Sequence, residues 1–380
     1  MNNIAKIIAQ LRETVGNPSQ VISDYSKKTG KGVVGCFPYY TPEEIVHAAG
    51  MLPIGLWGGE TQVAEVHSIL PAFTCPIMQS NMEFALRGAY NKLKAVIIPA
   101  PCDTLKSIGQ DWLYAIPQIK AILLVYPQMR KIEGGVQYLK TEFSRVQKEI
   151  EAIIGEPISD QALTRSIEIY NAHRAVMRAF AELAPSYPVT ITPSIRHLVI
   201  KSSFFMEKSQ HTEVVLTLMK ELRKLSAEKS SAKKVILTGI TAEPDGLLDL
   251  FQENGLTVVG DDLAQESRLF RTDVPVGSDP LTRLARQWSL IEGCSLAYDP
   301  EKKRGAMIVD LAKKTHADAI ILCMMKFCDP EEFDYPILAT EFAQAKLPLL
   351  YLEVDQQIQS LEQLRTRIQG FAEMINASEK

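Results

Sequence analysis

The chain has 380 residues, of which 46% are hydrophobic and 23% charged, a composition typical of a globular protein with more than one core. Its formal net charge of −4 gives no reason to expect nucleic acid or an anionic membrane as a partner. No stretch approaches the roughly eighteen uninterrupted apolar residues of a membrane span. The first residues, MNNIAKIIAQLRETVG, lack the apolar core of a signal peptide, so we expect a cytoplasmic protein.

Strands and helices alternate in the first third of the chain, after an N-terminal helix. A helix is predicted from Thr41, the expected N-cap, with Pro42 in its first turn. Such alternation predicts a parallel sheet with helices on both faces. We therefore assign residues 1–134 to a first α/β domain. Its expected strands are 33–37, 52–57, 94–99 and 121–126.

The strand pattern disappears after about Gly135. Two long amphipathic helices are predicted instead, at 138–155 and 158–184, because apolar residues recur at helical spacing with charges spread along the other face. The chain then turns polar around Glu228, in EKSSAKK, which indicates a domain boundary. These features predict a mainly helical segment over residues 135–230.

A second alternating pattern follows, and we assign residues 231–380 to a second α/β domain. The predicted fold is therefore α/β, with two doubly wound, Rossmann- or flavodoxin-like parallel-sheet domains and a helical segment between them. The expected strands of the second domain are 233–240, 256–262, 295–299, 317–324 and 347–354.

Two of the predicted strand ends carry the same dipeptide. Cys102-Asp103 follows the apolar run AVIIPAP, and Cys328-Asp329 follows AIILCMMKF. Open α/β sheets bind their ligands at the carboxyl ends of their strands. Without an export signal the cysteines are expected to be reduced. A thiol at this edge in each half therefore suggests a shared metal or a redox centre.

A third cysteine is expected to return to the same edge. Cys75 precedes a predicted helix of about 14 residues, about 21 Å long, and the next strand of about 6 residues returns about 20 Å. The two lengths nearly cancel, which brings Cys75 and Cys102 together. The amides and dipole of a helix N-terminus also favour thiolate at Cys75. If the edges of the two domains face each other, Cys328 joins them.

Three cysteines leave several kinds of site open. A structural zinc site usually takes four protein ligands in close pairs, whereas 27 and 226 residues separate these candidates and no CxxC occurs. A catalytic zinc site and a [4Fe-4S] cluster with one open iron both remain possible. Ordinary buried cysteines are the remaining alternative, and this description suits Cys294 and Cys323 best.

Long motifs in both halves resemble the β subunits of 2-hydroxyacyl-CoA dehydratases, a family related to benzoyl-CoA reductases. The similarity is closest to the branched-chain or aromatic type, 2-hydroxyisocaproyl-CoA or phenyllactyl-CoA dehydratase. Lactoyl-CoA and 2-hydroxyglutaryl-CoA enzymes share most of the motifs. Those that carry the resemblance are GCFPYYTPEEIVHAAGMLPIGLWGG, FTCPIMQS, VIIPAPCDTL, IKSSFFM, GDDLAQESRLFRTDVP, RQWSLIEGCSLAYDPEKKRG, MMKFCDPEEFDYP and EVDQQ.

The resemblance implies a [4Fe-4S] cluster held by Cys75, Cys102 and Cys328, with a non-protein ligand on the fourth iron. Cys36 does not carry over, because it lies two residues ahead of Pro38, the position where related subunits can have a cysteine. The resemblance also implies two partners, a homologous α subunit that binds most of the substrate and an ATP-dependent iron–sulfur activator. The implied reaction of this hydro-lyase is radical dehydration of an (R)-2-hydroxyacyl-CoA to the 2-enoyl-CoA through a ketyl. This chain's cluster would relay or store the electron.

Two other functions remain alternatives at this point. The chain could belong to a reductase of the benzoyl-CoA type, or it could be a CoA-ester-binding scaffold without a cluster.

Several polar residues have more than one possible role. Glu43 and Glu44 either complement a helix dipole or lie near the cluster. Arg268 and Arg271 could bind a CoA phosphate, form a subunit interface or join a buried ion-pair network. Asp103 and Asp329 are expected to cap the turns or helices that follow the cysteines. Further candidates are Lys201, Ser202 and Ser203 at the border of the cleft, His47 in the core or an interface, and Met324, Met325 and Phe327 as shields of the cluster.

Overall fold

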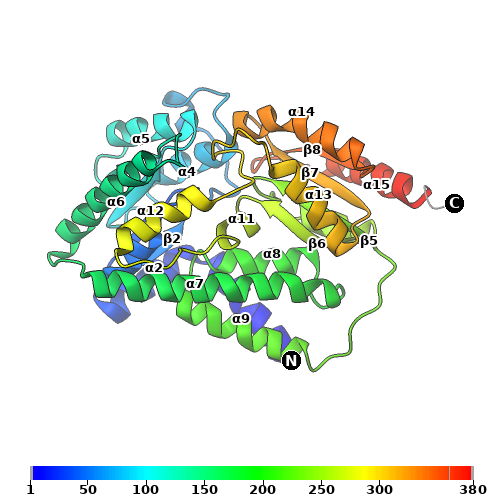
Figure 1. Ribbon diagram of the computed structural model, residues 1–380, viewed down its shortest axis with the longest axis horizontal. Helices are drawn as coiled ribbons and strands as arrows, with labels where there is room; N and C mark the ends of the chain where they lie inside the picture. The colour runs from blue at the N-terminus through cyan, green and yellow to red at the C-terminus, as the bar shows by residue number, and fades with distance from the viewer. Residues whose placement is uncertain (1–2, 359, 378–380) are drawn as a thin grey trace.

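The computed structural model describes residues 3–358 and 360–377, and within them it shows two four-stranded sheets whose paired strands are all parallel (Figure 1). The predicted fold class is therefore confirmed. The first sheet contains β1 (Val33–Cys36), β2 (Leu52–Gly55), β3 (Ala95–Pro99) and β4 (Lys120–Leu124). The second contains β5 (Lys233–Gly239), β6 (Leu256–Leu263), β7 (Ala319–Met325) and β8 (Leu349–Val354).

The two sheets have the same strand order. The first runs β2-β1-β3-β4 and the second β6-β5-β7-β8, so in each half the chain moves outward to one edge and then crosses to the other side of its first strand. Ligand crevices in open α/β sheets form where the strand order reverses, at the carboxyl ends. In this protein those positions lie between β1 and β3 and between β5 and β7.

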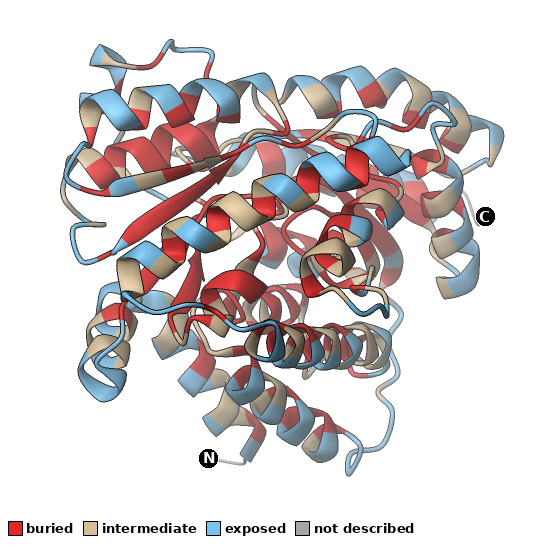
Figure 2. Cartoon of the chain, turned by 60° about the vertical axis from the view of Figure 1, so that its left-hand side comes forward, coloured by how far each residue is buried: buried red, intermediate tan, exposed pale blue. Residues whose placement is uncertain are grey.

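Helices cover the faces of both sheets, and most strand residues are consequently buried (Figure 2). The helices of the first half are α2 (Pro18–Thr29), α3 (Glu43–Ala48), α4 (Pro76–Leu86) and α5 (Asp103–Ala115), with the 3-10 helix η1 (Glu65–Ser68). Those of the second half are α10 (Leu247–Glu253), α11 (Ser267–Phe270), α12 (Pro280–Leu290), α13 (Arg304–Thr315), α14 (Asp329–Gln344) and α15 (Glu362–Ala377).

The part of the chain between the two sheets forms most of a layer of helices. Residues 125–232, all of them described, contain no strand, and the two long predicted helices are present as α6 and α7. The N-terminal helix α1 packs against α8 and α9, so it joins this layer rather than the first sheet (Figure 1). Helix α12 packs against α6 and so links the second half to the first. The layer consists of α1 (Asn3–Gly16), α6 (Glu133–Ile154), α7 (Asp160–Leu183), η2 (Ala184–Ser186), α8 (Pro193–Ser202) and α9 (Lys208–Leu222).

The predicted strand at 295–299 is wrong, because these residues form a loop. A short apolar run does not by itself distinguish a strand from other buried segments. Here the polar groups of the run make tertiary contacts instead of pairing in a sheet: Ser295 donates a hydrogen bond to Glu331, and the carbonyl of Tyr298 accepts one from Arg130. Gly293, with a φ of 61°, turns the chain into this loop.

One hydrophobic core extends across both sheets. It includes Val96 and Ile97 of β3 as well as Leu237 of β5 and Ile321 of β7. Close packing of this kind leaves little freedom for one half to move against the other. The carboxyl ends of the two sheets are therefore held in a fixed relation.

Candidate functional site

A cavity of about 390 Å³ is lined by residues from the carboxyl ends of both sheets. Its walls come from the segments after β1, β3 and β7, the start of α4 and the loop that follows α12. Cys75, Cys102 and Cys328 all line it. The structure therefore brings together the three cysteines that the sequence singled out. Cys36, Cys294 and Cys323 are buried and do not line this cavity.

Each of the three cysteines is the N-cap residue of a helix. Cys75 precedes α4, Cys102 precedes α5 and Cys328 precedes α14. The unpaired amides and the dipole at a helix N-terminus create positive potential there. The N-termini of three helices, one of them from the other half of the chain, thus surround a single cavity, which the carboxylates of Asp103 and Asp329 also line.

The return of Cys75 and Cys102 to one edge follows from the lengths of the intervening elements. Helix α4 has 11 residues and β3 has 5, so both span about 16 Å. The helix is shorter than the sequence pattern predicted, but the two lengths still cancel.

Burial, rather than the helix dipole, determines the protonation of the free thiols. Burial raises the pKa of Cys75 to about 12, and the backbone amides of Met78 and Ile77 offset only part of this effect. Burial also raises the pKa of Cys102, and it raises that of Cys328 further together with the charge of Glu331. The helix N-terminus therefore favours thiolate at Cys75, as the sequence predicted, but burial outweighs this effect. A metal that binds here must displace the thiol protons.

The donor set fits an iron–sulfur cluster better than a single metal ion. Within residues 3–358 and 360–377 no three His, Cys, Asp or Glu side chains are grouped to hold one ion. Zinc needs all its ligands about 2.0–2.3 Å from one point. In a [4Fe-4S] cluster each cysteine binds a different iron, so the sulfurs lie further apart around an inorganic core. Three cysteines spread around one cavity match the second arrangement.

Much of the remaining cavity wall is apolar. Ile77 and Met78 of α4 contribute, and so do Met325 and Phe327 just before Cys328. Of the three residues expected to shield the site, Met324 lies buried in β7 and does not line the cavity. Apolar walls limit the access of water and lower the local dielectric, which is how proteins tune the potential of a metal site.

The segment that carries Cys328 is anchored by a buried carboxylate. Glu331 is 0% exposed, and it accepts hydrogen bonds from Arg268 Nη1 (3.1 Å), Arg304 Nη2 (2.7 Å) and Ser295 Oγ (2.7 Å). Its amide donates to the carbonyl of Cys328 (3.0 Å). Burial raises the pKa of Glu331, but the two guanidinium groups outweigh burial and lower it. The ionised Glu331 thus fixes the first turn of α14.

Arg268 and Arg271 belong to the same ion-pair network, which is the third of their possible roles. Asp262 pairs with Arg268 Nη2 at 3.0 Å, with Arg271 Nη1 at 2.7 Å and with Arg304 Nε at 2.9 Å. Arg271 also donates to the carbonyls of residues 292 and 293. Their guanidinium groups are therefore engaged inside the protein.

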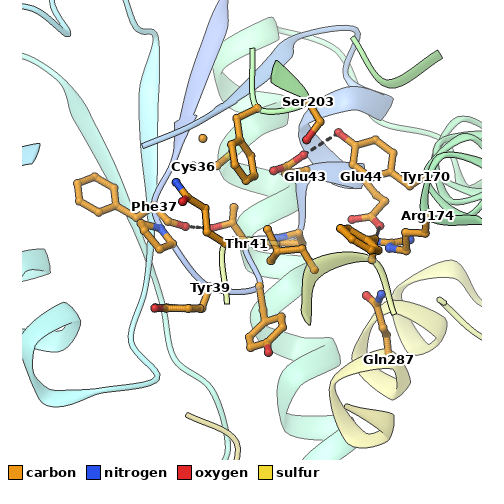
Figure 3. A pocket seen from close by; sticks show the side chains of 18 of the residues that line it. Cys36, Phe37, Tyr39, Thr41, Glu43, Glu44, Tyr170, Arg174, Ser203 and Gln287 are labelled. Carbon is orange, nitrogen blue, oxygen red and sulfur yellow. Dashed lines mark hydrogen bonds and ion pairs between the residues drawn. The ribbon is translucent and has the colours of Figure 1, made fainter. Parts of the chain in front are cut away.

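Glu43 and Glu44 lie in a second, inner pocket of about 120 Å³ (Figure 3). Glu43 accepts a hydrogen bond from Tyr170 (3.1 Å) and pairs with Lys208 Nζ (3.1 Å), while Glu44 pairs with Arg174 (2.5 Å). The two glutamates do not line the cysteine cavity. Pro38 and Tyr39 line both hollows and so separate them.

The sequence did not reveal this inner pocket. Its acidic residues lie in α3, more than a hundred residues before their basic partners in α7 and at the start of α9, so no local spacing connects them. The one sign of this pocket in the sequence was the pair of acidic residues in the first turn of α3.

The remaining polar candidates are accounted for by internal contacts. Ser203 lines the inner pocket, Lys201 pairs with Glu243 (2.5 Å) and Ser202 is hydrogen-bonded to His211 (3.0 Å). His47 is part-buried between Ser166 and Glu207, each at 2.9 Å.

The expectation that the two aspartates cap helices is wrong. Asp103 and Asp329 are the first helical residues of α5 and α14, because the preceding cysteines occupy the N-cap positions. An acidic residue in the first turn still complements the helix dipole. Placing a cysteine at the cap instead directs its sulfur to the helix N-terminus and the cavity.

A sequence model described as "2-hydroxyglutaryl-CoA dehydratase, D-component" matches residues 38–375. The chain belongs to this family. Two dehydratase relatives align with 99% of this chain and with their own full length: the lactoyl-CoA dehydratase subunit beta of Anaerotignum propionicum (45% identical) and the (R)-phenyllactyl-CoA dehydratase beta subunit of Clostridium sporogenes (43%). A benzoyl-CoA reductase subunit of Thauera aromatica is 25% identical over 90% of both chains.

Membership of the dehydratase family confirms the resemblance that the sequence motifs indicated. The family model covers all three cysteines of the cavity and every strand of the two described sheets except β1. The identities of 45% and 43% are too similar to select one acyl group. None of the helices in the described part of the chain is both long and apolar enough to cross a membrane.

Proposed function

We propose that this chain is the β subunit of a 2-hydroxyacyl-CoA dehydratase and that Cys75, Cys102 and Cys328 hold a [4Fe-4S] cluster. One observation carries the proposal: in a chain of this family, three cysteines at three helix N-termini line a single cavity between two sheet edges. The other cysteines lie outside that cavity, so the fourth iron has no cysteine ligand from this chain.

A bound [4Fe-4S] cluster supplies one-electron transfer, and the residues around it suit this task. The helix N-termini stabilise negative charge, the apolar walls limit contact with water, and the network around Glu331 keeps Cys328 in place. We assign this chain the role of relaying or storing the electron during radical dehydration of an (R)-2-hydroxyacyl-CoA to the 2-enoyl-CoA.

Two partners follow from this assignment. A homologous α subunit binds most of the substrate and forms a heterodimer with this chain. A separate iron–sulfur activator hydrolyses ATP and delivers the electron, since this sequence has no GxxxxGK[ST] phosphate loop. The higher identity to dehydratase subunits than to the benzoyl-CoA reductase subunit supports dehydration over ring reduction.

The cluster is tested by iron and sulfide analysis of the full chain after anaerobic purification, with an EPR spectrum of the reduced protein. We expect about four irons per chain, and a large loss of iron in Cys328→Ser. The matched control is Cys323→Ala, because Cys323 is a buried residue of β7 that does not line the cavity. Zinc in place of iron, or a colourless protein, contradicts the proposal.

The reaction is tested by combining the chain with its α subunit and activator. Formation of 2-enoyl-CoA from an (R)-2-hydroxyacyl-CoA is the expected result. Ring reduction of benzoyl-CoA without dehydration would instead place the chain with the reductases.

A further inference from the structure

Tyr39 stands at the wall between the cysteine cavity and the inner pocket, and it lines both. The residue is 6% exposed, and its hydroxyl has no hydrogen-bond partner among the described residues. Leaving a buried hydroxyl without a partner is unfavourable, because it loses its hydrogen bonds to water. Such a group beside a cavity therefore indicates a partner that occupies the cavity.

The backbone around Tyr39 is held in a conformation that L residues rarely adopt. Tyr39 has a φ of 79° and Tyr40 a φ of 61°, directly after β1 at the point where the strand order reverses. Residues in such conformations are strained and tend to occur at functional sites. The ring of Tyr39 packs edge-on against Trp57, with centroids 5.3 Å apart, which fixes its direction.

The hydroxyl of Tyr39 faces the cysteine cavity. In the view of the inner pocket it points away from Glu43 and Tyr170 (Figure 3). This orientation, together with the place of Tyr39 in the lining of the cysteine cavity, puts the hydroxyl on the cavity side of the wall.

We propose that Tyr39 donates a hydrogen bond to a sulfur of the [4Fe-4S] cluster and thereby raises the reduction potential of the cluster. This inference rests on the proposed function. Reduction adds one electron to the cluster, and the tyrosine keeps its proton and no covalent bond changes. A donor hydrogen bond stabilises the more negative, reduced state more than the oxidised state, so it makes reduction easier.

Tyr39→Phe tests this inference, because it removes the hydroxyl and keeps the ring that packs on Trp57. Tyr40→Phe is the matched control: Tyr40 also has a positive φ and an unpartnered hydroxyl, but it does not line the cysteine cavity. The full-length wild type and both variants are purified anaerobically. Their iron content, their EPR-monitored midpoint potential and their proton couplings in H₂O and D₂O by pulsed EPR are compared.

We expect equal iron content, a more negative potential in Tyr39→Phe alone, and the loss of one exchangeable proton coupling in that variant. An unchanged potential and an unchanged coupling overturn the inference and leave the proposed function intact. If Tyr39→Phe does not assemble a cluster, the pulsed-EPR spectra of the wild type test the inference instead. The absence of a coupled exchangeable proton in the wild type overturns it. A wild type without iron and sulfide overturns the proposed function itself.

Discussion

His197 in α8 shows how burial and pairing compete at a single side chain. Its Nδ1 lies 2.7 Å from a carboxylate oxygen of Glu266, and its Nε2 lies 3.8 Å from Glu243. Burial lowers the pKa of His197, but the carboxylates of Glu243 and Glu266 outweigh burial and raise it above its ordinary value of 6.5. The protonated ring therefore stabilises the contact between the helical layer and the second sheet.

The sign of the pH dependence follows from this shift. A raised pKa in the folded state means that the stabilisation by His197 is complete below about pH 6.5 and is lost as the pH rises through the folded value. We expect the melting temperature to fall as the pH rises above about 6.5, and His197→Gln to remove much of that slope. The measurement is thermal unfolding by circular dichroism across this range.

The exposed His67 provides the control, since His67→Gln should leave the slope as it is. An equally steep slope in His197→Gln would contradict the assignment.

Glu266, the partner of His197, affects stability at acidic pH. Burial raises the pKa of Glu266, but Arg196 and His197 outweigh burial and lower it to about 2. Its stabilisation is therefore present above about pH 4.5 and is lost as the pH falls toward 2.

The contact between strands β5 and β7 is closest at the carboxyl end of β5. Gly239 pairs with Cys323 across the parallel ladder, with a φ of 129°. A Cβ atom at Gly239 would lie 2.1 Å from the carbonyl oxygen of Cys323. A side chain at this position must push β7 away, and Cys328 lies just beyond the end of β7.

Gly239→Ala should therefore lower the free energy of unfolding by about 2–4 kcal/mol, from the positive φ and the clash together. Urea unfolding measures it. The matched control is Gly370→Ala on an exposed position of α15, where a Cβ meets nothing within 4 Å. That change should stabilise the protein by about 0.5–1 kcal/mol, because alanine is the better helix former. A wild-type urea midpoint for Gly239→Ala would refute the close approach.

The elements of this fold were predictable where one pattern dominates. The strands of both sheets are apolar runs between helical segments, and α6 and α7 have clear helical periodicity, so the sequence predicts them. The run at 295–299 is neither a strongly apolar run nor clearly periodic. Its tertiary contacts with Arg130 and Glu331 decide its conformation.

The candidate site was predictable for the same reason, because element lengths and a topology rule place Cys75, Cys102 and Cys328 at sheet edges. The role proposed for Tyr39 was not, because it depends on a left-handed φ and on a position at the cysteine cavity that only tertiary structure sets. A tyrosine in the sequence does not predict the positive φ at position 39, since glycine is the residue that normally signals one.

At the scale of the whole molecule, two buried side chains join the halves that carry the cysteines. Arg130, between β4 and α6, donates to the carbonyls of Trp288 (2.9 Å), Ser289 (2.9 Å) and Tyr298 (3.1 Å). Gln356, after β8, donates to the carbonyl of Trp57 (2.9 Å) and accepts from Ser80 (3.0 Å). Because Cys75 and Cys102 belong to one half and Cys328 to the other, these links help to fix the width of the cavity.

Arg130→Met should leave three carbonyl groups without their donor and lower the free energy of unfolding by about 3–5 kcal/mol. Arg130→Lys should recover only part of this loss, because a single ammonium group cannot reproduce the fork of a guanidinium. Arg286→Met is the matched control: Arg286 forms a largely exposed pair with Glu133 across the neighbouring α12–α6 contact. An exposed pair contributes about 0–1 kcal/mol.

Hydrogen exchange distinguishes a local role of Arg130 from a role in joining the halves. If Arg130 only orders its own loop, exchange in Arg130→Met rises around residues 127–132 alone. If it joins the halves, exchange also rises across residues 288–298, whose carbonyls it binds, and reaches the start of α14, because Ser295 in this segment holds Glu331. We expect the second pattern. We also expect weaker retention of iron, because the loosened segment contacts Glu331, and the amide of Glu331 donates to the carbonyl of Cys328.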